Sequence, residues 1–316
     1  MTSKTYRVSL LSFCIVSLLI GVVSTSQANT QNSLSFENWV ERLRNQAFAK
    51  GISVNTLENA FSQNKQMDLP KESVQNSLAS VQSTLQSKLT FSKLLRKQYG
   101  DALFEIKHLF GVDIDVIIAI ASIENEITES YPAIDILINQ SFKQPRNIVL
   151  QNELLQALKI IDEGQINAQQ LKSDFQGKLG RTHFKPSVFR DYAIDYDGDG
   201  RFDLWQSYPD IFASTANYLN KMGWQTGKNW GIEVGLPEGF DPTLININQQ
   251  KSLNKWQEMG IFQADGNELP TSSNLGSLIQ IDNDKYYIVL DNYFALLRWK
   301  RSAEHAYTVG RLIDLL

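Results

Sequence analysis

The sequence has almost none of the side chains that form disulfides and soft metal sites. Its 316 residues include a single cysteine, Cys14, and three histidines that stand far apart. A disulfide needs two thiols, and a zinc site needs clustered Cys and His ligands. Cys14 follows the bulky Phe13 inside an apolar run near the N-terminus. We therefore expect no disulfide, no zinc cluster, no lipidation and no cysteine nucleophile in the mature protein.

Positive charge is also in short supply. Lys and Arg total 30 against 34 Asp and Glu, which gives a formal net charge of −4 at pH 7. Two of the basic side chains and none of the acidic ones lie in residues 1–28, so the chain without this segment is more acidic still. Because phosphate binding needs a basic surface, we expect no nucleic-acid partner.

The apolar run at the N-terminus is short for a membrane span, which needs about 20 residues. Lys4 and Arg7 precede the run at residues 8–23, and Ser26-Gln27-Ala28 follows as a small-residue cleavage site. This order is typical of a secretory signal peptide. We predict a cleaved signal peptide over residues 1–28 and a periplasmic protein. An uncleaved N-terminus that anchors the protein to a membrane is the alternative.

Apolar periodicity predicts an α+β protein that is mainly helical. Helices are expected over residues 34–66, 88–110, 148–163, 209–223 and 303–315, with strands from about 275 to 290 around a turn at Asp282-Asn283-Asp284. The segment Val116–Ala121 is apolar on every side, which is typical of a buried central helix. Asp113 or Asp115 could cap its start.

An acidic loop at residues 195–210 has the ligand spacing of an EF-hand. Such a loop takes oxygen ligands from positions 1, 3, 5, 7 and 9 and needs Gly at position 6. The matching groups here are Asp195, Asp197, Asp199, the Arg201 carbonyl and Asp203, with Gly200 at position 6. Gln206 stands where the bidentate Glu is usual, and Asp210 is a nearby substitute. We predict a structural Ca²⁺ site, with a solvated acidic turn as the alternative.

Glu124 is the candidate general acid. It follows Ile117, Ile120 and Ala121 at intervals that place all four side chains on one helix face. Burial raises the pKa of a carboxyl group, and a carboxyl that stays protonated near neutral pH can donate a proton. We therefore expect a raised pKa for Glu124. The alternative is that Glu124 ends the helix, reaches solvent and has no chemical role.

Several segments occur in the order found in one enzyme family. They are SFENWVERLRNQAFAKGIS, FGVDIDVIIAIASIEN, the DGDG loop with the helix after it, NWGIEVGLPEGFD and LDNYFALLRWKRS. In these segments the chain resembles the lytic murein transglycosylases of the membrane-bound type B (Slt35-like) family. The resemblance implies a lysozyme-like core with an added helical domain and a small β domain. We place the helical region at 29–100, the catalytic core at 101–235 and the C-terminal region at 236–316.

The resemblance also implies a substrate and a reaction. The substrate is the glycan strand of peptidoglycan, cut at the MurNAc-β-1,4-GlcNAc bond without water. The muramic 6-hydroxyl attacks C1 and leaves a 1,6-anhydro ring, and one carboxyl group serves as acid and then as base. By position, that group is Glu124. The implied protein is a monomer that could act with other cell-wall enzymes.

The sequence departs from the family around the expected glycan groove. His183 in KLGRTHFKPS stands for a glutamine, Lys300 in RWKRS for an asparagine, and His305 for a tyrosine. The resemblance gives, as substrate-binding residues, His183, Pro186, Ser187, Tyr218, Lys300 and Ser302. A cation near Glu124 would favour its ionised form. The second hypothesis is therefore a degenerate homologue that binds peptidoglycan or a cell-wall partner without cutting it. A calcium sensor is not expected without the Glu at position 12.

Overall fold

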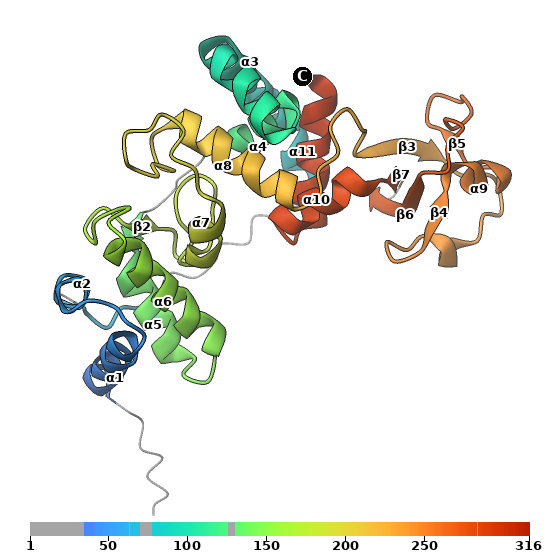
Figure 1. Cartoon of the computed structure of the whole chain (residues 1–316). Coiled ribbons are helices and arrows are strands. Elements are labelled where there is room, and N and C mark those ends of the chain that lie inside the picture. Colours follow the sequence, from blue (N-terminus) through green and yellow to red (C-terminus); the bar gives the residue numbers. More distant parts are fainter. Residues whose placement is uncertain (1–34, 63, 70–77, 126–129, 283) are drawn as a thin grey trace, which may run out of the picture. The chain divides into compact units, whose positions relative to one another are not determined.

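The structure is a computed structural model, and it describes residues 35–62, 64–69, 78–125, 130–282 and 284–316 (Figure 1). The predicted signal peptide lies outside these residues. Residues 36–316 belong to a single unit by their internal contacts. In the described part of the chain, no helix combines the length and the apolar character that crossing a membrane requires.

The first helices follow the predicted periodicity. Helix α1 (Phe36–Ala49) and helix α2 (Val54–Ala60) lie where residues 34–66 were expected to be helical. They are separated by Gly51, whose φ of +90° suits glycine. Ser53 caps α2, because its side chain accepts a hydrogen bond from the Thr56 N–H. Helix α1 packs against helices α5 (Ala133–Lys143) and α6 (Ile148–Asp162), and α2 packs against α6.

A central helix, α4 (Ile114–Ile123), is surrounded by three others. They are α3 (Leu78–Phe110), α8 (Tyr208–Lys221) and α11 (Ala303–Leu315). The side chains of Val116–Ala121 are all buried, as their apolar character predicted. The prediction that Asp113 or Asp115 caps α4 through its side chain is wrong, because both carboxylates have other partners. Asp113 accepts from the Trp224 indole and the Gly227 N–H, and Asp115 pairs with Arg96.

Shorter elements complete the helical part. Strands β1 (Tyr131–Pro132) and β2 (Lys172–Ser173) pair antiparallel, and helices α7 (Pro186–Tyr192) and α10 (Asp291–Trp299) lie near α8. Leu179 and Phe184 also form a two-way backbone bridge, with N···O distances of 2.7 and 3.2 Å. This bridge closes a small loop over residues 179–184. The sequence analysis did not predict β1, β2 or this loop.

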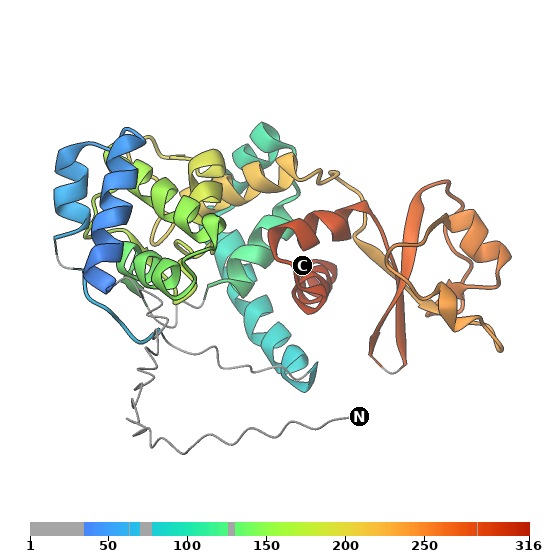
Figure 2. The ribbon, with the colours of Figure 1, turned by 90° about the horizontal axis from the view of Figure 1, so that it is seen from below.

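The C-terminal region holds a five-stranded antiparallel sheet in the order β4-β6-β7-β3-β5. Its strands are β3 (Gly231–Gly235), β4 (Gln250–Ser252), β5 (Phe262–Gln263), β6 (Leu275–Asp282) and β7 (Lys285–Val289). The short helix η1 (Pro242–Leu244) and helix α9 (Leu253–Glu258) connect them (Figures 1 and 2). The predicted β6–β7 pair is confirmed, while Asn283 of its turn lies outside the described residues.

The sheet has an apolar core of its own. Trp256, Ile261, Leu278 and Ile288 are buried together there, separate from the larger core of the helices. The two cores agree in outline with a helical body and a small β domain, and the predicted domain boundaries stay predictions. The predicted fold class, α+β and mainly helical, is confirmed.

Candidate active site

Glu124 is buried at the end of the central helix. It is the C-cap residue of α4, its backbone N–H donates to the Ile120 carbonyl, and only 5% of it is exposed. The side chain continues the face of Ile117 and Ile120, as predicted. The alternative in which Glu124 reaches solvent is therefore wrong.

Three basic side chains approach the Glu124 carboxylate from distant parts of the described chain. The Nε2 atom of His305, at the start of α11, lies 2.5 Å from Oε1. The Nζ atom of Lys300, just after α10, lies 3.4 Å from the same oxygen. The Nε2 atom of His183, in the 179–184 loop, lies 3.5 Å from Oε2. All three residues are among the departures from the family pattern named in the sequence analysis.

The predicted raised pKa of Glu124 is wrong. Burial does raise it, and burial is the largest single effect. The short contact with His305 and the positive charges of His183 and Lys300 together outweigh burial, and they hold the pKa of Glu124 well below its ordinary value. Glu124 is therefore an ionised carboxylate at neutral pH in this arrangement.

The carboxylate opens into a pocket of about 440 Å³. Its lining consists of Glu124, Lys178, Thr182, His183, Phe184, Lys185, Val188, Tyr218, Arg298, Trp299, Lys300 and Arg301. One wall is aromatic: the ring centroids of Phe184 and Tyr218 lie 5.2 and 5.3 Å from that of Trp299. The rest of the lining is mostly basic. An apolar wall facing hydrogen-bonding groups suits an amphipathic ligand such as a sugar.

Positive charges crowd one another in this pocket. Burial lowers the pKa of Lys178, and the nearby charges of Lys300 and Lys185 lower it further, against the opposite effects of Asp174 and Glu124. Glu124 is the only carboxylate among the residues that line the pocket. The surplus of positive charge in the pocket favours a ligand that carries negative groups.

The predicted substrate-binding residues divide into two groups. His183, Lys300 and Tyr218 line the pocket, and the Tyr218 hydroxyl donates to the Arg298 carbonyl at 2.6 Å. Pro186, Ser187 and Ser302 do not line it. Pro186 is buried in the first turn of α7.

The two serines serve the scaffold. The Ser187 N–H and hydroxyl both donate to the buried Glu153 carboxylate, at 2.9 and 2.8 Å. The Ser302 hydroxyl accepts from the His305 N–H at 3.1 Å and so caps α11. Ser302 acts on the site through His305, whose position it fixes.

Sequence reasoning missed Asp174, which lies in a turn before the 179–184 loop. Its Oδ1 accepts from the N–H groups of Gln176 and Lys178 at 2.8 and 3.0 Å. Its Oδ2 lies 3.1 Å from Nδ1 of His183. A lone Asp in a polar stretch carries no signal of such a role, because the partner is identified only once the turn is folded.

A larger pocket, of about 820 Å³, lies elsewhere and does not include Glu124. Amide side chains such as Gln165, Asn167 and Gln206 line it, together with Arg181 and Trp205. The one carboxylate in its lining belongs to Asp203, which accepts hydrogen bonds from the N–H groups of Trp205 and Gln206 in the acidic loop. We therefore place the candidate active site at the smaller pocket.

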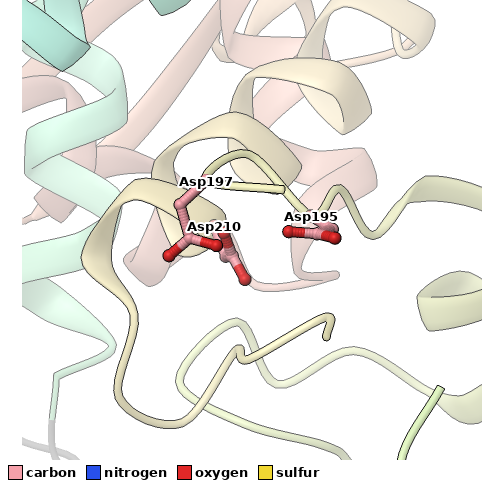
Figure 3. A group of neighbouring side chains, drawn as sticks. All are labelled: Asp195, Asp197 and Asp210. Carbon is pink, nitrogen blue, oxygen red and sulfur yellow. The ribbon is translucent and has the colours of Figure 1, made fainter. Parts of the chain in front are cut away.

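The acidic loop gathers three of its predicted ligands. Carboxylate oxygens of Asp195, Asp197 and Asp210 lie within 4.8 Å of one another (Figure 3). Asp210 is buried, and its two oxygens accept from the N–H groups of Tyr196 and Asp203, each at 2.9 Å. Burial raises the pKa of Asp210, and the negative charges of Asp197 and Asp195 raise it further.

The other predicted ligands lie outside this group. The Asp199 carboxylate accepts from the Arg201 N–H, and the Asp203 carboxylate accepts from the N–H groups of Trp205 and Gln206. Within the described part of the chain these three carboxylates form no ion pair with a basic side chain, and such a cluster fits a hard cation, which prefers oxygen ligands. Asp210, the substitute suggested for position 12, is part of the cluster.

Comparison with known proteins agrees with this fold. Residues 35–314 match the family described as Transglycosylase SLT domain, and the chain belongs to this family. Over 229 residues it is 29% identical to membrane-bound lytic murein transglycosylase B of Escherichia coli (strain K12), which covers 68% of this chain. The match spans 60% of the length of that relative. The predicted family is confirmed.

Two solved structures show the same fold. SltB3 from Pseudomonas aeruginosa, in complex with NAG-NAM-pentapeptide, is 32% identical, with a TM-score of 0.84 over 89% of this chain and 79% of that one. The Escherichia coli lytic transglycosylase Slt35, in complex with calcium, is 23% identical, with a TM-score of 0.73 over 88% of this chain and 93% of that one. Two of these three relatives, the Escherichia coli proteins, carry the name lytic transglycosylase.

Proposed function

We propose that this protein is a lytic transglycosylase that cuts peptidoglycan at the MurNAc-β-1,4-GlcNAc bond and leaves 1,6-anhydro-MurNAc ends. The observation that carries the proposal is Glu124, a single buried carboxylate facing a pocket with an aromatic wall. Membership of the family supports it, and so does the sugar–peptide ligand of the similar SltB3 structure.

In the proposed reaction Glu124 acts twice. In its protonated form it gives a proton to the glycosidic oxygen as the bond to C1 breaks. The muramic 6-hydroxyl then forms the new bond to C1, and the Glu124 carboxylate takes the hydroxyl proton. Hydrolases of the usual kind need a second carboxylate to activate water or to bind C1. A pocket lined by one carboxylate fits a reaction in which the substrate supplies its own nucleophile.

A second candidate is a homologue that binds peptidoglycan without cutting it. The observation in its favour is the basic group around Glu124, which keeps the carboxylate ionised and so opposes a general acid. Both candidates predict binding to peptidoglycan, but only the transglycosylase predicts the release of anhydro-muropeptides.

The deciding experiment is digestion of purified sacculi with the mature protein, followed by mass analysis of the soluble products. We expect anhydro-muropeptides from the parent protein. Glu124→Gln keeps the shape of the side chain and removes its proton, so it should lower the rate by about 10²-fold or more. Sacculi that bind the protein yet release no anhydro product would favour the binding role.

We also propose a structural Ca²⁺ held by Asp195, Asp197 and Asp210. A cation there would offset the repulsion among carboxylates that are clustered within 4.8 Å. The calcium complex of Slt35, a protein of the same fold, supports the choice of ion. The ion would serve the loop and not the reaction, because the cluster shares no residue with the pocket lining.

We place the protein in the periplasm, where peptidoglycan is found, after removal of the signal peptide predicted at residues 1–28. The N-terminal anchor is the alternative. N-terminal sequencing of the protein from fractionated cells tests both: a soluble form starting near Asn29 supports export with cleavage. We further propose that the protein acts as a monomer on glycan strands and meets other cell-wall enzymes there.

A further inference from the structure

His183 has a strained backbone within the active-site pocket. Its φ of +49° is the only positive φ of a non-glycine residue in the described part of the chain. Such strain persists only where the surroundings enforce it, and it concentrates at functional sites. Here the bridge between Leu179 and Phe184 closes the loop, and Gly180 packs so tightly that an added Cβ would meet the Leu204 carbonyl oxygen at 2.6 Å.

The strained residue joins two carboxylates. On one side, Nδ1 of His183 lies 3.1 Å from Oδ2 of Asp174. On the other, Nε2 of His183 lies 3.5 Å from Oε2 of Glu124. Asp174 is itself fixed, because two backbone N–H groups donate to its other oxygen. The result is a chain of three titratable groups that ends at the proposed acid.

The chemistry of Asp174 decides which nitrogen of His183 carries the first proton. Burial raises the pKa of Asp174, but its hydrogen bond with His183 and those from Lys178 and Gln176 outweigh burial and keep the carboxyl ionised. An ionised carboxylate only accepts hydrogen bonds. Nδ1 of His183 is therefore the N–H that donates to Asp174, and Nε2 is free to hold or release a second proton in front of Glu124.

His305 is closer to Glu124 but is placed differently. It is 7% exposed, it does not line the pocket, and neither of its ring nitrogens forms a hydrogen bond of regular geometry with a described residue, although Nε2 lies 2.5 Å from Oε1 of Glu124. His305 therefore contacts Glu124 from the buried side of the carboxylate and not from the pocket. His183, by contrast, lines the pocket, is 24% exposed and is backed by Asp174.

We propose that His183, held by Asp174, is the proton store for Glu124 in this enzyme. The inference rests on the proposed transglycosylase reaction. Before cleavage the proton is on His183 Nε2 and Glu124 is a carboxylate. The proton passes to Glu124 Oε2 and on to the glycosidic oxygen as the bond to C1 breaks. The proton of the muramic 6-hydroxyl then passes to Glu124 and back to His183 as the new bond to C1 forms, so no net proton is gained or lost.

This arrangement resolves the conflict in the site. The basic side chains around Glu124 lower its pKa and so favour its ionised form in the resting state. A proton on Nε2 of His183, 3.5 Å from Oε2 of Glu124, is available for transfer although Glu124 itself rests as a carboxylate. The distance is longer than a working hydrogen bond, as is common before substrate binds. The charged groups that face this pair are Lys178 and Asp174 from the turn, Lys300 after α10 and His305 from α11.

His183 and Asp174 act through Glu124 and are therefore positioning residues, and the pH dependence of the rate tests them. The reactive state has one proton on the Glu124–His183 pair, so the rate should fall on the alkaline side within pH 5–8, where a histidine changes charge. In His183→Gln only Glu124 can carry the proton, so this limb should move to lower pH and the rate at pH 7 should fall about tenfold or more.

Asp174→Asn should give a smaller shift in the same direction. It removes the carboxylate that stabilises the charged imidazole, which should move the limb to lower pH by roughly one to three units. The matched control is His108→Gln, an exposed histidine on α3 that should leave the profile unchanged. A His183→Gln enzyme whose alkaline limb coincides with that of the parent overturns the proposal.

A second measurement separates this proposal from the proposed function. The carboxyl carbon resonance of Glu124, identified by its loss in Glu124→Gln, can be titrated in the folded protein whether or not it cuts glycan. We expect the parent resonance to show a second deflection within pH 5–8 that disappears in His183→Gln and moves in Asp174→Asn. If the titrations of Glu124 and His183 are coupled but the protein does not cut glycan, only the proposed reaction is refuted. If the protein cuts glycan but the two titrations are independent, the proposal that His183 stores the proton for Glu124 is refuted.

Discussion

Arg181 binds both oxygens of Asn125, the residue that follows Glu124. Its Nη1 donates to the Asn125 carbonyl at 2.5 Å and to the side-chain Oδ1 at 2.8 Å. The Tyr208 hydroxyl donates to the same Oδ1 at 2.7 Å. The end of the helix that carries the catalytic carboxylate is thus tied to the loop that carries His183. These contacts give Asn125 a positioning role beside Glu124.

Arg181→Lys should damage catalysis more than binding. A lysine cannot reproduce the planar donor group of arginine, so Asn125 and Glu124 would lose their fixed position. We expect kcat to fall about 10- to 100-fold with a small change in KM, because small misplacements of a reacting group are costly. The control is Arg190→Lys on α7, which removes a similar set of contacts with Gln156 of α6 and with Glu163, the residue after α6. An equal loss of kcat in both variants would show a general effect on folding.

The ionised state of Glu124 should appear in the pH dependence of stability. A carboxyl whose pKa is lower in the folded state stabilises the fold above its unfolded pKa, about 4.3 for Glu. That contribution is lost as pH falls through the folded pKa. At pH 7 we expect Glu124→Gln to be less stable by about 3 kcal/mol, because basic partners lose their buried counter-charge. The difference should shrink below about pH 4.

Urea unfolding of both proteins from pH 7 to pH 3 measures this difference. The control is Glu58→Gln, which changes an exposed glutamate of α2. If the gap between the parent and Glu124→Gln grows as the pH falls, Glu124 has a raised pKa after all, and the basic group around it does not act as the geometry indicates.

Calcium should raise the melting temperature of the protein. An ion that binds only the folded chain stabilises it by about 2.7 kcal/mol at a free concentration of 100 Kd. Asp210→Asn removes the buried member of the cluster and should abolish most of the rise. Asp101→Asn, an exposed change on α3, should keep it. Identical melting curves in calcium and in chelator would remove the ion from this loop.

The basic pocket should make binding depend on salt and on the charge of the ligand. We expect glycans that keep their acidic stem peptides to bind more tightly than stripped glycans, and the preference to weaken in high salt, where the Debye length falls below about 8 Å. Lys178→Met should reduce the preference, and Lys221→Met, at the exposed end of α8, should not. Equal binding of the two glycans at low salt would contradict the prediction.

Much of the fold was readable from local patterns. The all-apolar segment Val116–Ala121 can only be a buried helix, because an exposed helix needs a polar face. The closing helix at 303–315 and the β6–β7 pair were also found by their periodicity. The short strands β1 to β5 were missed, since segments this brief carry too little periodicity and form only through pairing with distant partners.

For the site, the sequence determined which residues are present, and the tertiary structure decided what they do. Periodicity placed Glu124 on a buried face, and burial alone predicts a raised pKa. Lys300, however, is 176 positions away in the sequence, and it meets the carboxylate only when α10 and α11 close on α4. The electrostatic state of a carboxyl group depends on distances of a few ångströms. Those distances are set by packing, so the charge of Glu124 and the link from Asp174 through His183 belong to the folded protein alone.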